Sequence, residues 1–150
     1  MPHSHYRTLP HILVGLMTVF FLLACNSPVA SSRWEVHANL YSGRENPQRQ
    51  LSSEEAEQFE AMLAELPVGT VSQRGELGYQ GFMVQREGQT NASGIIRVIV
   101  YDGIVEVTEA GGSYYLGDPD RALEQWLFDV SRGILADAEQ QLIEEDLNVN

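Results

Sequence analysis

Lysine is absent from this chain of 150 residues, and its nine basic residues are all arginines. Without lysine the chain cannot form a Schiff base, supply the lysine of a phosphate-binding loop, or use a lysine as a general base. Its 21 acidic residues give a formal net charge of −12. Because the phosphates of nucleic acid would repel such a chain, nucleic-acid binding is excluded. The charge would attract a basic partner, although its simplest effect is solubility.

Cysteine and histidine are also scarce, and Cys25, the only cysteine, cannot form a disulfide bond within the chain. His37 is the only histidine after Cys25, and one histidine is too few for a typical zinc site. A nucleophile–histidine pair would also depend on His37, and no serine lies in a Gly-x-Ser-x-Gly motif. The acidic runs at 118–120 and 144–146 lack the spacing of a calcium-binding loop. We therefore predict no catalytic residue, no metal site and no cofactor.

The first 24 residues have the parts of a secretory signal: a polar start without acidic residues, an apolar run, and a small residue at the end. The apolar run from Leu9 to Ala24 is interrupted by Pro10 and His11. It is shorter than the roughly 18 apolar residues expected of a membrane-spanning helix. A cleaved signal is therefore favoured over an uncleaved membrane anchor.

The segment Leu22-Leu23-Ala24-Cys25 resembles a bacterial lipobox. The resemblance implies that residues 1–24 are removed and that Cys25 is lipidated, which requires more than one acyl chain for lasting attachment. Asn26 follows in place of the aspartate that retains lipoproteins at the inner membrane, so the resemblance implies the outer membrane, facing the periplasm. Residues 25–32 then form a short tether. Cleavage would remove Arg7 and no acidic residue, leaving 8 basic against 21 acidic residues, a charge of −13.

Residues 33–150 have the size of one ordinary domain. We predict an α+β fold with an antiparallel sheet of about four strands and two or three helices packed on one face, in the order β-α-β-β-β-α. Trp34 and Trp126 are the expected anchors between the layers. The supporting patterns are an alternating strand at 33–41, a helix from Ser52 to Pro67, a strand at 79–86, a hairpin at 94–109 around Asp102-Gly103, an additional short strand at 113–116, a helix starting at Asp118-Pro119, and an acidic helix within 135–147. In the last helix Leu142, Ile143 and Leu147 are available to pack. Loops are predicted at 42–50, 68–78 and 87–93.

The most distinctive segment is the loop Tyr41-Ser42-Gly43-Arg44-Glu45-Asn46-Pro47. With Trp34, Leu40 and the later segment 77–82, it resembles a pattern found in small uncharacterised bacterial proteins, several of them lipoproteins, to which no activity is attached. One interpretation makes Tyr41, Arg44 and Asn46 a recognition surface, in which arginine would capture carboxylates or carbonyls. The other has Arg44 and Asn46 bonding the backbone of their own loop.

These observations favour a membrane-anchored, non-enzymatic binding or accessory module that contacts another envelope protein, one that could be basic. An inhibitor of a basic cell-wall hydrolase such as lysozyme is an alternative, because opposite charges speed encounter. A hydrolase that uses a Glu/Asp pair is a third hypothesis, since many carboxylates are present and no pair stands out.

Overall fold

A computed structural model describes residues 33–70, 78–86 and 94–148 of the chain. The predicted signal, Cys25 and the tether lie outside these residues, as do residues 71–77 of the loop predicted at 68–78 and all of the loop predicted at 87–93. None of the helices in the described ranges is long and apolar enough to span a membrane.

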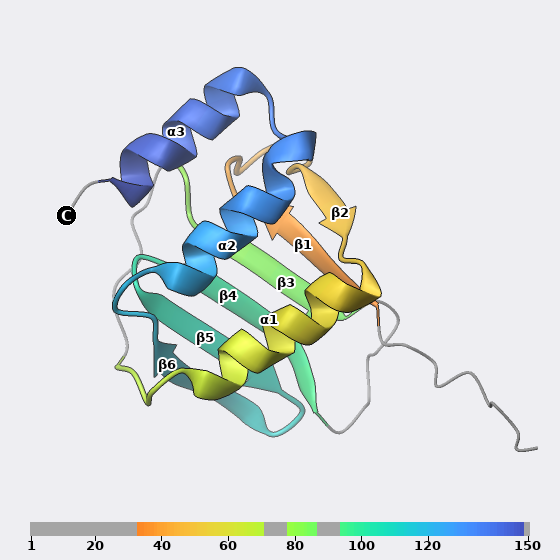
Figure 1. The fold of residues 1–150 in the computed structure, drawn as a ribbon, viewed down its shortest axis with the longest axis vertical. Helices are drawn as coiled ribbons and strands as arrows, with labels where there is room; N and C mark the ends of the chain where they lie inside the picture. The colour runs from red at the N-terminus through yellow and green to blue at the C-terminus, as the bar shows by residue number, and fades with distance from the viewer. Residues whose placement is uncertain (1–32, 71–77, 87–93, 149–150) are drawn as a thin grey trace, which may run out of the picture. The chain divides into compact units, whose positions relative to one another are not determined.

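Six strands of the described residues form one antiparallel sheet in the order β2-β1-β3-β4-β5-β6. Figure 1 shows the helices on one side of this sheet, with α1 and α2 lying across the strands. The strands are β1 (Trp34–Ala38), β2 (Gln48–Gln50), β3 (Phe82–Arg86), β4 (Ile95–Tyr101), β5 (Ile104–Glu109) and β6 (Gly112–Gly117). The helices are α1 (Ser53–Glu65), α2 (Ala122–Ser131), the short 3₁₀ helix η1 (Arg132–Ile134) and α3 (Asp137–Leu147).

The predicted α+β class, with an antiparallel sheet and helices on one face, is confirmed. The predicted count of about four strands is too low. β2 lies within residues 42–50, predicted as a loop because the sequence Gln-Arg-Gln has no apolar alternation. It pairs with β1 through its backbone, with Val36 opposite Arg49. The short strand β6 completes the other edge.

The core lies between the sheet and the helices. Trp34, Val36 and Ala38 of β1 point into it, as the alternating pattern predicts. In α1, Phe59 packs edge-on against Trp34, with ring centroids 5.3 Å apart. On its other side Phe59 stacks with Trp126 at 6.5 Å. Trp34 is thus the buried anchor expected between the layers, whereas Trp126 is only half-buried.

The α1 boundaries follow the sequence signals. The Ser52 hydroxyl accepts a hydrogen bond from the Glu55 backbone N–H, and the Glu55 carboxylate accepts one from Ser52, which is the predicted capping box. The helix ends at Glu65, with Leu66 extended before Pro67. Local sequence therefore fixes both ends of this helix.

The hairpin between β4 and β5 also forms as predicted. Asp102 and Gly103 have φ angles of 50° and 73°, as a type I′ turn requires. In the neighbouring segment, Gly81 lies so close to β4 that a Cβ atom there would be 2.1 Å from the Val100 oxygen. The glycine is therefore needed for a close backbone approach. It also interrupts the predicted strand at 79–86, so β3 begins only at Phe82 and Tyr79 turns into the core.

Two helix predictions need correction. The predicted start at Asp118-Pro119 is early: α2 begins at Ala122, because residues 118–121 form a turn closed by the Arg121 N–H on the Asp118 carbonyl. The Asp118 side chain still caps the helix, since it accepts bonds from the Leu123 and Glu124 N–H groups. In α3, Leu142 was expected to pack but is exposed.

Candidate functional site

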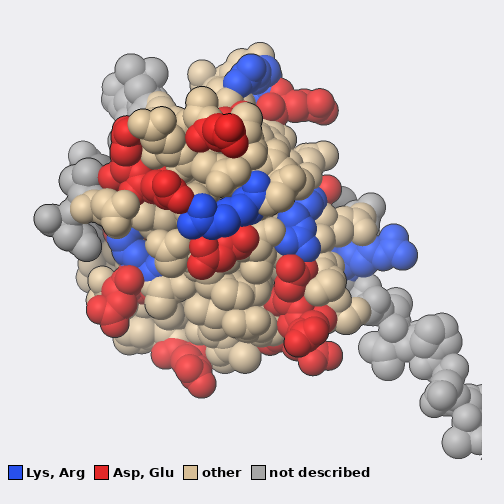
Figure 2. Space-filling view, turned by 45° about the horizontal axis from the view of Figure 1, so that its top comes forward, with Lys and Arg blue, Asp and Glu red and all other residues tan. Residues whose placement is uncertain are grey.

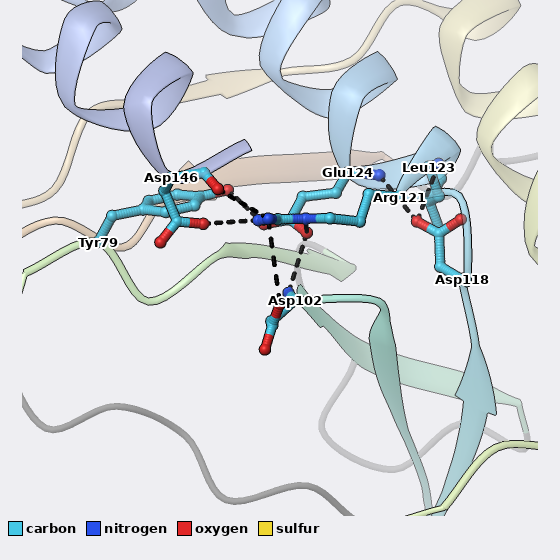
Figure 3. Close-up of polar contacts among 7 residues, drawn as sticks. All are labelled: Tyr79, Asp102, Asp118, Arg121, Leu123, Glu124 and Asp146. Atoms are coloured by element: carbon cyan, nitrogen blue, oxygen red, sulfur yellow. Dashed lines mark hydrogen bonds and ion pairs between the residues drawn. The ribbon is translucent and has the colours of Figure 1, made fainter. Parts of the chain in front are cut away.

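A buried ionic cluster joins three parts of the fold (Figure 3). Arg121, just before α2, makes a two-pronged contact with Glu124: Nε donates to Oε2 at 3.0 Å and Nη2 donates to Oε1 at 3.1 Å. The same guanidinium donates to Asp146 near the end of α3, to its side chain at 2.6 Å and to its backbone carbonyl at 2.9 Å. Arg121 therefore ties the end of α3 to the start of α2.

Glu124 is fully buried, and its two oxygens each accept two hydrogen bonds. Besides those from Arg121, the Tyr79 hydroxyl donates to Oε1 at 2.9 Å and the Asp102 N–H donates to Oε2 at 3.0 Å. A carboxylate has about four acceptor positions, so Glu124 is saturated. Burial raises the pKa of Glu124, against the opposing effect of Arg121, and burial with the nearby Glu124 also raises the pKa of Tyr79. The geometry gives Glu124 a structural role and leaves it no acceptor position for a substrate.

Arg121 adopts a left-handed backbone conformation with φ 51°, which is uncommon for a residue with a Cβ. Burial lowers the pKa of the Arg121 guanidinium. The hydrogen bonds that Arg121 donates to Glu124 and Asp146 have the larger combined effect, so the pKa is raised and the charge is permanent. The turn at 118–121 and the ionic contacts keep Arg121 in this strained backbone conformation. The cluster is thus a fixed element of the scaffold.

The loop at 41–47 is organised by Asn46. Its Oδ1 atom accepts hydrogen bonds from the backbone N–H groups of Leu40 at 3.0 Å and of Tyr41 at 2.9 Å. This arrangement agrees with the structural interpretation of the loop for Asn46. It closes the loop onto the end of β1 and fixes the direction in which the segment leaves the sheet.

Tyr41 and Arg44 lie on top of one another in the same loop. The Arg44 guanidinium carbon is 3.5 Å from the centroid of the Tyr41 ring, a cation–π contact. The Tyr41 hydroxyl donates to Glu139 of α3 at 2.5 Å. This bond raises the pKa of Tyr41 and lowers that of Glu139. Arg44 therefore stacks on a side chain instead of bonding the loop backbone, which corrects the structural interpretation for this residue.

A polar pocket of about 270 Å³ adjoins this loop. Its walls come from the loop after β1 and from the segment before β3, which are joined by the Gln80 N–H on the Asn39 carbonyl at 2.8 Å. The lining side chains are mostly neutral amides and hydroxyls. They belong to Asn39, Leu40, Tyr41, Ser42, Asn46 and Gln80, with Gly78 contributing backbone. Two of the three predicted recognition residues, Tyr41 and Asn46, thus line one pocket, with Arg44 stacked beside them.

His37 lies where the alternation of β1 places it, on the sheet face opposite the helices. Its Nε2 atom is 2.9 Å from Glu35 and 3.1 Å from the Gln85 amide nitrogen. The side chain is 12% exposed and Glu35 is 23% exposed. The three side chains form a polar cross-strand cluster, in which the contacts of His37 are with its neighbours on the sheet.

The sequence interpretation missed Arg121 and Glu124. One signal was available: Glu124 lies four residues before Phe128 and three before Leu127, on the apolar side of α2. A charged residue at such a position indicates a buried ion pair. Its partners come from segments distant in sequence, and no local pattern identifies them.

In residues 33–70, 78–86 and 94–148, no three histidine, cysteine, aspartate or glutamate side chains group closely enough to hold a metal ion. Comparison with protein-family models, with curated proteins and with solved structures gives no match to this chain.

Proposed function

We propose that this protein is a lipid-anchored binding module of the bacterial cell envelope, and that the loop at 41–47 with its pocket is the recognition site. The resemblance of residues 22–25 to a lipobox supports the anchor at Cys25. The outer membrane facing the periplasm is the expected location, with another envelope protein as the partner. No catalytic step is assigned.

The observation that carries the proposal is the prebuilt polar pocket at the end of the sheet. Asn46 holds the loop backbone, and the Tyr41–Glu139 bond holds the ring that lines the pocket. Binding loops held in this way lose little conformational entropy when a partner docks. A pocket of about 270 Å³ has room for one side chain or a short stretch of backbone.

Arg44 supplies the charge at this site. Arg44 is exposed, and its guanidinium carbon lies 3.5 Å from the centroid of the Tyr41 ring. Such a group bonds carboxylates in a two-pronged manner. The partner segment is therefore expected to present a carboxylate to Arg44 and hydrogen-bonding groups to Asn39 and Ser42.

Photo-crosslinking in cells tests the proposal. The probe is placed at Ser42, which is exposed and lines the pocket, and the control probe at Ala110, which is exposed in the β5–β6 turn. We expect one envelope protein to be captured from Ser42 and not from Ala110. Lipidation of Cys25 is checked by mass spectrometry on the same preparation.

A variant of Asn46 links the capture to the loop geometry. Asn46→Ala removes the acceptor of two backbone N–H groups and is expected to reduce capture, whereas Asn46→Asp keeps an acceptor and should retain it. Equal capture from Ser42 and Ala110, or no product from a folded and lipidated chain, would contradict the proposed recognition site.

A further inference from the structure

A second hollow lies on the helical side of the domain, away from the loop pocket. It has a volume of about 470 Å³ and is lined by α1, α2 and the end of α3. Its apolar surface comes from three half-buried side chains whose inner sides pack against the core: Met62, Trp126 and Leu147. We call this hollow the helix groove.

Charged residues surround the apolar surface of the helix groove. Asp120 and Asp129 are exposed at its edge. Arg121 also contributes to the wall, but its guanidinium is bound by Glu124 and Asp146. Asp129 is in turn paired with Arg132 at 3.1 Å. Four carboxylates, those of Asp120, Asp129, Glu124 and Asp146, thus stand against the two arginines, so the groove has a net negative charge. Figure 2 shows that on the face in view acidic side chains are spread widely among the arginines.

Trp126 is the distinctive residue of the helix groove. One face of its ring stacks on Phe59, with the ring planes 20° apart. Other aromatic rings of the fold are covered by arginines of the chain itself, in the pairs Arg44–Tyr41, Arg86–Trp34 and Arg132–Phe128. Within the described ranges no arginine stacks on Trp126 in this way. Tryptophan is the aromatic side chain that attracts cations best.

We propose that the helix groove docks a cationic, amphipathic polypeptide segment of a partner protein. Apolar side chains of the segment pack on Met62, Leu147 and the edge of Trp126. Arginine or lysine side chains of the segment contact Asp120, Asp129 and the part of Trp126 that lines the groove. The mode is that of an amphipathic helix in a groove, in which apolar anchors give affinity and charge gives orientation.

The proposal goes beyond the loop pocket because it concerns a different surface and a different ligand chemistry. Within residues 33–70, 78–86 and 94–148 no arginine of the chain stacks on Trp126, so the cation is assigned to another molecule. The affinity should fall with rising salt, since the contributing carboxylates are exposed.

Binding of a labelled model peptide tests the proposal. The probe is a fluorescein-labelled, 14-residue helical peptide of leucine and lysine, measured by anisotropy with the full chain in detergent and corrected with a protein-free detergent blank. We expect saturable binding that weakens with salt. The same peptide with glutamate in place of lysine should not bind.

Matched variants localise the binding. Asp120→Asn with Asp129→Asn should weaken binding about three- to tenfold, the loss expected for two exposed charge pairs. Glu45→Gln with Glu109→Gln removes the same charge from exposed positions outside the groove and should change binding less than about twofold. Trp126→Phe, which keeps an aromatic ring against Phe59, should weaken binding through the lost cation–π contact.

Three results would overturn the inference: no binding of the lysine peptide, equal weakening by the two double variants, or an unchanged affinity of Trp126→Phe. Circular dichroism confirms that each variant is folded. Asn46→Ala is expected to bind the peptide normally, so failure of the loop site and failure of the helix groove are distinguishable.

Discussion

Helices α1 and α3 lie on the same side of the sheet and are attached to the domain by different forces. α1 buries Phe59 and Leu63 and places three further apolar residues against the core, Ala56, Met62 and Leu66. In α3, every residue of which is described, Ile143 is buried and Leu147 packs partly against the core. Polar contacts also hold its two ends: Tyr41 bonds Glu139 in the first turn, and Arg121 bonds Asp146 in the last. Burial thus has the larger share in attaching α1, whereas α3 combines less burial with polar contacts at both ends.

The contrast teaches which forces can be recognised in a sequence. A stripe of apolar residues at helical spacing indicates a buried helix face, and this inference does not require knowing which element packs against it. A polar contact depends on two residues that are distant in sequence, here about 100 positions apart for Tyr41 and Glu139. The following predictions, from the largest expected effect to the smallest, test whether α3 depends on its polar contacts as the structure indicates.

Removal of the Arg121 side chain should have the largest effect. Arg121→Ala leaves Glu124 as a buried carboxylate without its cation and releases Asp146, so we expect the free energy of unfolding to fall by about 3–5 kcal/mol. Chemical denaturation followed by circular dichroism measures the loss. Arg132→Ala is the control, because Arg132 makes two ion pairs on the surface and its loss should be small. Equal losses in the two variants would show that the buried cluster contributes no special stability.

Neighbouring residues of α3 provide a second comparison. Ile143→Ala removes its one buried side chain and should destabilise the domain by about 2–4 kcal/mol. Leu142→Ala changes an exposed side chain of the same size and should remain within about 0.5 kcal/mol. Thermal unfolding of the two variants, side by side, gives the difference. A loss at Leu142 as large as that at Ile143 would contradict the orientation of α3.

The smallest effect concerns the bond between Tyr41 and Glu139. This bond lowers the pKa of Glu139, so its stabilising effect is complete above the pKa of the unfolded chain and is lost as the pH falls through the pKa of the folded protein. In Tyr41→Phe the pKa of Glu139 should rise toward the ordinary glutamate value. A carboxyl-carbon NMR titration measures it, with Tyr114→Phe as a control. An unchanged Glu139 pKa would mean that the bond does not form in solution.

Much of the fold was predictable, because its signals are local. The capping box at Ser52, the turn at Asp102-Gly103 and the alternation of 34–38 each specify a structure within a few residues. Strand β2 was missed because three polar residues at a sheet edge have no apolar pattern. The start of α2 was misplaced because Asp118 caps the helix from beyond a turn. That turn depends on contacts with the rest of the fold.

The site was predictable only in part. The density of glycine, arginine, asparagine and proline singled out the loop at 41–47, and the structure brings Tyr41, Arg44 and Asn46 together there. The pocket wall supplied by Gln80 and the link to Glu139 join distant segments, so no local pattern could reveal them. The same is true of the helix groove, which exists only where three helices meet.

The attachment of α3 also has a consequence for the order of folding. Tyr41 and Arg121 find their acceptors, Glu139 and Asp146, only after residues 137–147 have been synthesised. Until then Glu124 has part of its cluster, and the ring of Tyr41 has no anchor for its hydroxyl. Docking of α3 therefore completes the ionic cluster and anchors the Tyr41 hydroxyl in one step.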